Sequence, residues 1–173
     1  MRQRDHLVSS AAMIVQVGGL ANRLLLVAIV TGLGATWLIP GFFHRLLAQA
    51  NPAVDVSDAL FGVRLLMLIG IVMAIIFDRM LVSMGAVIAS AASGDPFVPD
   101  NASRLRTIGW ALLMLQLLDI PCALLARFWP SLGSAAPSGD ISIGGWAATL
   151  MVFVLARVFA AGSDMREELA GTV

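Results

Sequence analysis

Four apolar stretches, each long enough to cross a bilayer as a helix, divide the chain. Residues 24–43 are 20 consecutive uncharged residues, and a helix of that length spans a hydrocarbon core of about 30 Å. The second stretch, residues 59–77, carries Arg64 in its first turns, where the aliphatic stem lets the guanidinium return to the headgroups. The third and fourth stretches are residues 107–126 and 141–161. The pattern predicts an all-α integral membrane four-helix bundle.

The residues before the first stretch are only mildly apolar. Within residues 7–21, Ser9, Ser10 and Gln16 interrupt the apolar positions, which is typical of an amphipathic helix that lies in the membrane interface. An extension of the first spanning helix fits the same residues, and both alternatives stay open. The first stretch exceeds the 7–15 apolar residues of a signal-peptide core, so we expect it to be retained as a span.

Residues 78–106 join the second and third stretches and are expected to lie outside the membrane. Apolar positions continue at helical spacing beyond residue 78, so the second helix is expected to run on to about Ala92. Gly94 then permits a left-handed end to the helix. Asp100 or Asn101 is expected to cap the next helix. The whole chain, residues 1–173, is expected to form a single membrane domain.

The arginines predict how the chain is threaded. All 11 basic residues are Arg. With four spans, the two termini and the 78–106 connection share one side and hold seven of them, with an eighth close by, whereas the other side holds three. Because positive residues are retained in the cytoplasm, both termini are predicted to be cytoplasmic.

Composition excludes several classes of protein. Hydrophobic residues make up 59% of the chain and charged residues 13%, against roughly 45–50% and 25% in a soluble domain. An ordinary soluble enzyme, a disordered chain and a secreted disulfide scaffold are therefore excluded. The formal net charge of zero leaves no basic excess for direct binding of nucleic acid. Cys122 is the single cysteine, so the chain has no internal disulfide.

The sequence contains no short motif of catalytic or metal chemistry. It has no His-Glu-x-x-His, no Gly-x-Ser-x-Gly, no phosphate loop and no paired cysteines. His6 and His44 are predicted on opposite sides of the membrane and cannot share a metal ion. We therefore expect no enzymatic activity, no cofactor and no metal site.

Asp119 is the main polar exception within the predicted spans. A carboxylate at mid-span costs about 2.5–3.5 kcal/mol on insertion scales, so it should face the bundle or be protonated. Gln116 lies three residues earlier on the same helix face. Arg64 lies at a comparable predicted depth in an antiparallel span, which suggests an Asp119–Arg64 pair. The pair is interpreted as structural rather than as a proton or ion relay, because the bundle offers no second acid.

Residues 94–106 carry the most distinctive surface pattern. One interpretation is a rigid cytoplasmic elbow that docks a partner, with Phe97 as the apolar anchor. The other is a helix stop, a tight turn and a helix start, which we favour because every residue already has a local role. The candidate partner-binding residues are Asp95, Pro96, Phe97, Asn101, Arg104 and Arg106.

The same block carries a resemblance to a known family. The matching residues are Gly94-Asp95-Pro96-Phe97-Val98-Pro99-Asp100-Asn101, Arg104-Leu105-Arg106 and the tail around Met165-Arg166-Glu167-Glu168-Leu169. Over nearly its whole length the chain resembles a bacterial family of four-span membrane proteins of unknown function. It departs from the family at Arg157, where an acidic residue is common. Genes of that family often neighbour small helix-turn-helix regulators, so the resemblance implies a membrane partner of a cytoplasmic transcription factor.

Together these observations predict a non-enzymatic, multi-pass protein of the bacterial inner membrane that regulates or senses for a cytoplasmic partner. The alternative is an oligomeric small transporter or channel subunit that uses Asp119 and Gln116. Small residues four apart, such as Gly70 and Ala74, would also suit helix contacts in a homo-oligomer.

Overall fold

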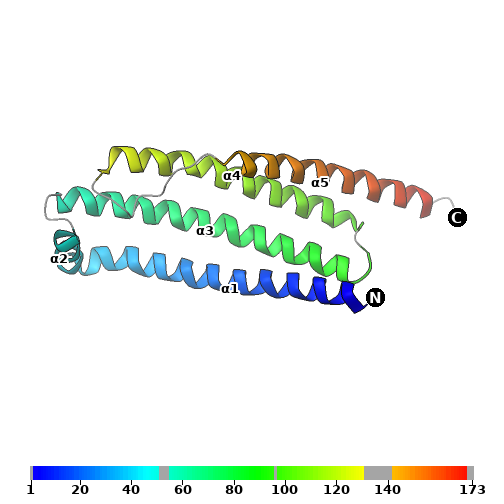
Figure 1. The fold of residues 1–173 in the computed structure, drawn as a ribbon, viewed down its shortest axis with the longest axis horizontal. Coiled ribbons are helices and arrows are strands. Elements are labelled where there is room, and N and C mark those ends of the chain that lie inside the picture. The colour runs from blue at the N-terminus through cyan, green and yellow to red at the C-terminus, as the bar shows by residue number, and fades with distance from the viewer. Residues whose placement is uncertain (1, 51–54, 96, 131–141, 171–173) are drawn as a thin grey trace. The chain divides into compact units, whose positions relative to one another are not determined.

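The chain folds into helices throughout the part that the structure describes. The computed structural model describes residues 2–50, 55–95, 97–130 and 142–170, and within them it has five α-helices and no strand (Figure 1). The helices are α1 (Arg2–Leu38), α2 (Pro40–Ala50), α3 (Val56–Ala92), α4 (Pro99–Phe128) and α5 (Ile143–Ala170). Among these described residues, four helices, all except α2, are long and apolar enough to cross a membrane. The predicted all-α four-helix architecture is confirmed.

The long helices expose much apolar side chain. Leu24 is 63% exposed, Trp37 70% and Leu150 67%. On a water-soluble protein such surfaces would form large hydrophobic patches. In a bilayer they carry no such penalty, because the lipid tails are as apolar as leucine. Helix α1 has the smallest buried share of the four candidate spans.

Helix α1 is continuous through the residues whose placement the sequence left open. Residues 7–21 belong to it, so they extend the first span and form no separate helix. The helix ends at Leu38, before the predicted boundary at residue 43, and α2 begins at Pro40. Proline disfavours the helical conformation of the residue before it and suits the first position of a new helix.

The ends of α3 and α4 differ in how well the sequence predicted them. Helix α3 runs to Ala92 as expected, and Gly94 ends it with a left-handed backbone at φ 86°. Helix α4 begins at Pro99, whose fixed φ suits a first helical position. Asp100 and Asn101 therefore lie inside the first turn of α4, and neither is the cap that the sequence predicted.

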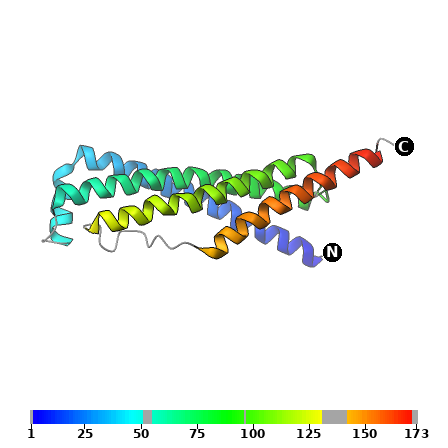
Figure 2. The ribbon, with the colours of Figure 1, turned by 90° about the horizontal axis from the view of Figure 1, so that it is seen from above.

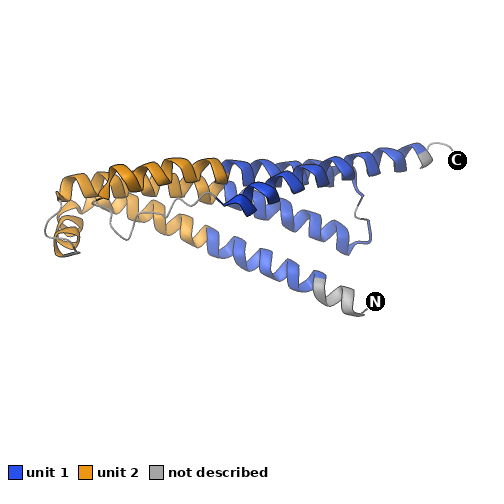
Figure 3. Cartoon of the chain, turned by 45° about the horizontal axis from the view of Figure 1, so that its top comes forward, with its two compact units in different colours: residues 1–22, 76–114, 142–173 blue, residues 23–75, 115–141 orange. Residues whose placement is uncertain are grey.

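The helices form two compact units (Figure 3). The first unit, unit 1, contains the described residues within 1–22, 76–114 and 142–173. The second, unit 2, contains those within 23–75 and 115–141.

Unit 1 has a core shared by α3, α4 and α5. Met80 of α3, Leu105 and Ile108 of α4 and Ala156 of α5 form one buried cluster. Gly109 allows α4 and α5 to approach closely, since a Cβ there would lie 3.0 Å from a ring carbon of Phe153. Figures 1 and 2 show the α3–α4 connection and the C-terminal half of α5 at the same end of this unit.

In unit 2, α1 and α3 pack through glycines. A Cβ at Gly32 would lie 3.5 Å from the Met67 methyl carbon, and one at Gly70 would lie 3.5 Å from Ile29 Cδ1. These are ordinary van der Waals distances, so each glycine seats a side chain of the facing helix. Small residues at such positions bring helices close in a membrane, where dispersion contacts drive packing.

Candidate functional site

In unit 1, the α3–α4 connection is held against α5 by an aromatic pair and an ion pair. The Phe97 and Phe159 rings stack with centroids 5.1 Å apart. The Arg166 guanidinium donates a hydrogen bond to the Asp95 carboxylate. Gly162 leaves room for the Phe97 ring, because a Cβ at Gly162 would lie 3.0 Å from Phe97 Cδ1. We call these five residues, Asp95, Phe97, Phe159, Gly162 and Arg166, the connection cluster.

Asn101 joins the end of α3 to the start of α4. Its side chain is fully buried, at 0% exposure. The Asn101 amide nitrogen donates to Ser90 Oγ at 2.5 Å, and its amide oxygen accepts from Arg104 at 2.9 Å. Asn101 was a candidate partner-binding residue, but its burial assigns it to the interior of the turn. Sequence patterns could not predict the Ser90 contact, because a turn separates the two residues.

The other candidate partner-binding residues are distributed around this turn. The side chain of Asp95 is 44% exposed and that of Arg104 31%. Phe97 is 41% exposed, so one part of the ring packs on Phe159 and the rest stays open. Arg106 is exposed, and Pro96 lies outside the described residues.

Arg64 has a specific role in unit 2. Pro40 has no N–H, so the Thr36 carbonyl lacks the donor that residue 40 would otherwise supply within a continuous helix. The Arg64 guanidinium donates to this carbonyl at 2.9 Å and to Thr36 Oγ1 at 3.1 Å. The guanidinium carbon also lies 4.2 Å from the ring centroid of Trp37, within cation–π range. We call Thr36, Trp37, Pro40 and Arg64 the Arg64 cluster.

The proposed Asp119–Arg64 pair is not found among the ion pairs between described residues. Asp119 instead lines a cavity of about 310 Å³ in unit 2 together with Gly70 and Met73 of α3. The α3 residues that line this cavity extend from Leu66, two positions after Arg64, to Met73. Gln116, the predicted companion of Asp119, is not among the described residues that line this cavity.

In unit 2, a polar contact joins the residue that follows α4 to α3, and sequence reasoning missed it. The indole Nε1 of Trp129 donates to the Asp58 carboxylate at 2.9 Å. Trp129 also packs on Phe61, with ring centroids 5.9 Å apart. Because 71 positions separate Trp129 from Asp58, only the pairing of the helices could reveal the contact.

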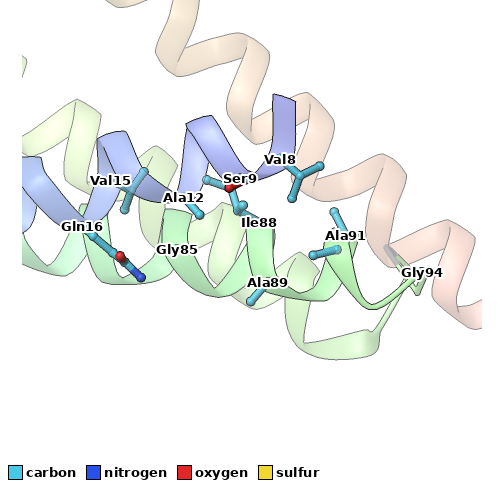
Figure 4. A pocket seen from close by; sticks show the side chains of 11 residues that line it. Val8, Ser9, Ala12, Val15, Gln16, Gly85, Ile88, Ala89, Ala91 and Gly94 are labelled. Atoms are coloured by element: carbon cyan, nitrogen blue, oxygen red, sulfur yellow. The ribbon is translucent and has the colours of Figure 1, made fainter. Parts of the chain in front are cut away.

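A larger groove lies between α1 and α3 in unit 1 (Figure 4), with a volume of about 840 Å³. Ser9, Ala12 and Gln16 line it from α1, while Gly85 and Ala89 line it from α3. Its walls are small or apolar residues, and Gln16 is exposed. Among the described residues, no three His, Cys, Asp or Glu side chains come together as a metal site.

The arrangement defines a class of protein: an all-α chain with four helices suited to crossing a membrane and with polar contacts that hold helix ends and turns. A family model described as "Protein of unknown function (DUF2975)" matches residues 36–173. This match covers most of the chain, so the chain belongs to that family, and the resemblance to a four-helix family of unknown function is confirmed. No curated protein and no solved structure matches the chain.

We predict that Arg64→Met destabilises the protein and that Pro40→Ala partly restores it. Arg64→Met leaves the buried Thr36 carbonyl unsatisfied, at a cost of about 1–3 kcal/mol, and Pro40→Ala returns an N–H at the position that can donate to it. Unfolding in detergent, followed by tryptophan fluorescence, measures the double-mutant cycle. Arg45→Met is the matched control, because exposed Arg45 bonds to the Gly41 carbonyl of its own helix and, among the described residues, to no other element. Additive effects of Arg64→Met and Pro40→Ala would contradict the assignment.

We predict that Asn101→Leu lowers the free energy of unfolding by about 1–3 kcal/mol, because a buried hydrogen-bonding group is lost from between Ser90 and Arg104. Ser103→Ala is the control, since the exposed Ser103 hydroxyl bonds to the Asp100 carbonyl of its own helix, and we expect a change within about 0.5 kcal/mol. Thermal unfolding in detergent compares the two variants. Equal stability of both would show that the Asn101 contacts contribute nothing.

Proposed function

We propose that the chain is a non-enzymatic, multi-pass protein of the bacterial inner membrane that regulates or senses for a cytoplasmic partner. The partner class that we propose is a helix-turn-helix transcription factor. The observation that carries the proposal is the connection cluster, which joins the α3–α4 connection and α5 into one preformed surface. A preformed surface loses less conformational entropy when a partner binds.

The surface has the composition of a protein-docking site. Phe97 offers a half-exposed aromatic ring, and the side chain of neighbouring Arg166 is 59% exposed. Aromatic and arginine side chains are enriched among residues that dominate binding energy. The Asp100 side chain, 72% exposed, and exposed Arg106 add charges of both signs at the rim.

Two observations support the proposed orientation, with both termini in the cytoplasm. The arginines are concentrated in the segments that four spans assign to one side, seven against three with an eighth close by. The N-terminal part of α1, the α3–α4 connection and the C-terminal part of α5 also belong to the same compact unit.

The second candidate function is an oligomeric transporter or channel subunit. The observation in its favour is that Asp119 lines a cavity among apolar residues. Gln116 was expected to act with Asp119 but does not contribute to the described lining of that cavity. A single carboxylate gives a moving proton or ion no second site along the span, so we prefer the regulatory role.

We predict that reporters fused to the two chain ends behave alike. Green fluorescent protein should fluoresce at either end, and alkaline phosphatase should be inactive at both, since this phosphatase needs the oxidising periplasm. A fusion after Arg45, in α2, should give the reverse pattern. Activity of the phosphatase at one end only would contradict the orientation and the number of spans together.

We predict that reversing charges on the exposed rim disrupts partner binding. Asp100→Arg combined with Arg106→Glu should reduce co-purification with a helix-turn-helix protein encoded beside this chain by at least about tenfold, because like charges placed across an interface repel. Arg45→Glu, a charge reversal at another exposed residue, on α2, should leave co-purification unchanged. Binding that survives the double reversal, or the absence of any such co-purifying regulator, would refute the proposed partner.

A further inference from the structure

We propose that the Asp119 cavity binds a soft monovalent metal ion, of which Cu(I) is the biological representative and Ag(I) the redox-inert analogue. Met67 and Met73 line the cavity from α3, while Asp119 and Cys122 line it from α4. The inference stands independently of the proposed function, since the cavity lies in unit 2 and the connection cluster in unit 1.

The donor set favours a soft ion over a hard one. Two thioethers and one thiol face a single cavity, and thioether and thiolate sulfur select Cu(I) among the common metal ions. Hard cations such as Ca²⁺ require six to eight oxygen ligands, whereas Asp119 supplies the only carboxylate of the described lining. The remaining lining residues are apolar, including Ile29 and Leu66.

The positions of these residues suit joint coordination. Asp119 and Cys122 are three residues apart on α4 and therefore share a helix face. Met67 and Met73 are separated by about 9 Å along α3, with Gly70 between them. The three rotatable bonds of a methionine side chain let its sulfur adapt to a ligand within such a space. Cys122 is only 4% exposed, which shields the thiol from water.

The binding step balances in charge and in electrons. Binding replaces the S–H bond of Cys122 with a metal–sulfur bond and releases the thiol proton to the solvent, as metal binding to thiols does. The single positive charge of Cu(I) and the single negative charge of the thiolate then cancel, without any change of oxidation state.

The test is a metal titration of the intact chain, purified in detergent under reducing, anaerobic conditions. Cu(I) is titrated against a chromophoric chelator, and Ag(I) retained after desalting is counted by mass spectrometry. We expect one ion per chain. Replacing the thiol in Cys122→Ser should weaken binding by at least about tenfold, since even outer-shell changes cost 10–100-fold. The double variant Met67→Leu, Met73→Leu should also bind more weakly.

Met114→Leu and Met151→Leu are the matched controls. Both methionines lie outside the cavity lining and are 40% and 70% exposed, and the exchange of Met for Leu nearly conserves volume. They should bind Cu(I) as the unaltered chain does. Should Cys122→Ser fail to fold, as judged by thermal unfolding, the methionine double variant decides the question.

Several results would overturn the proposal. They are unchanged affinity in a folded Cys122→Ser or methionine double variant, equal losses in the two controls, or displacement of the ion by Zn²⁺ or Na⁺. X-ray absorption of the Cu(I) form should show sulfur neighbours, and a shell of nitrogen or oxygen alone would equally refute it. Loss of partner binding in the charge-reversal variants would leave these outcomes unaffected.

Discussion

The backbone carbonyl that Pro40 leaves without a helical donor is the constraint on which one end of the structure depends. Thr36 is fully buried, and a backbone carbonyl that water cannot reach must find its donors within the protein. Arg64 supplies them to Thr36, and its position over Trp37 follows from that requirement. The same requirement holds more widely, because no buried side-chain nitrogen or oxygen among the described residues lacks a partner. Thr149 and Ser163 meet it by bonding to carbonyls of their own helices.

Hydrophobic patterning was sufficient to predict the helices but not their contacts. The four spans and the long α3 follow from runs of apolar residues, since length and periodicity are local properties. The break at Pro40 is also local, and proline chemistry could have located it within a residue. The contacts of Arg64 could not be derived in this way, because matching depths in two spans allows several partners, and one of them is the Thr36 carbonyl that Pro40 leaves without a donor. Asn101 illustrates the same limit, since its partner Ser90 lies across a turn.

The two interpretations of residues 94–106 are compatible once burial is known. Asn101 is buried and Gly94 ends α3, so both serve the turn, whereas Phe97 and Asp95 both hold α5 and remain partly exposed. The exposed Asp95–Arg166 pair contributes about 0–1 kcal/mol to stability at most, so the packing of Phe97 on Phe159 and Gly162 provides most of the attachment. One aromatic ring therefore holds the α3–α4 connection and its charged side chains against α5. Because this attachment is small, a bound partner can rearrange the connection at a small cost in free energy.

The Asp119 cavity shows why a search for short sequence motifs can miss a metal-binding site. Motif searches look for cysteine and histidine at short spacing, and methionine in an apolar helix is ordinarily assigned to the core. Here the donors come from two helices, and the single cysteine is three residues from the acid rather than beside a second thiol. Lipid adds a criterion that motifs lack, because a buried site must be close to neutral when occupied. One thiolate carries one negative charge, so a monovalent ion bound to the Cys122 sulfur meets that criterion.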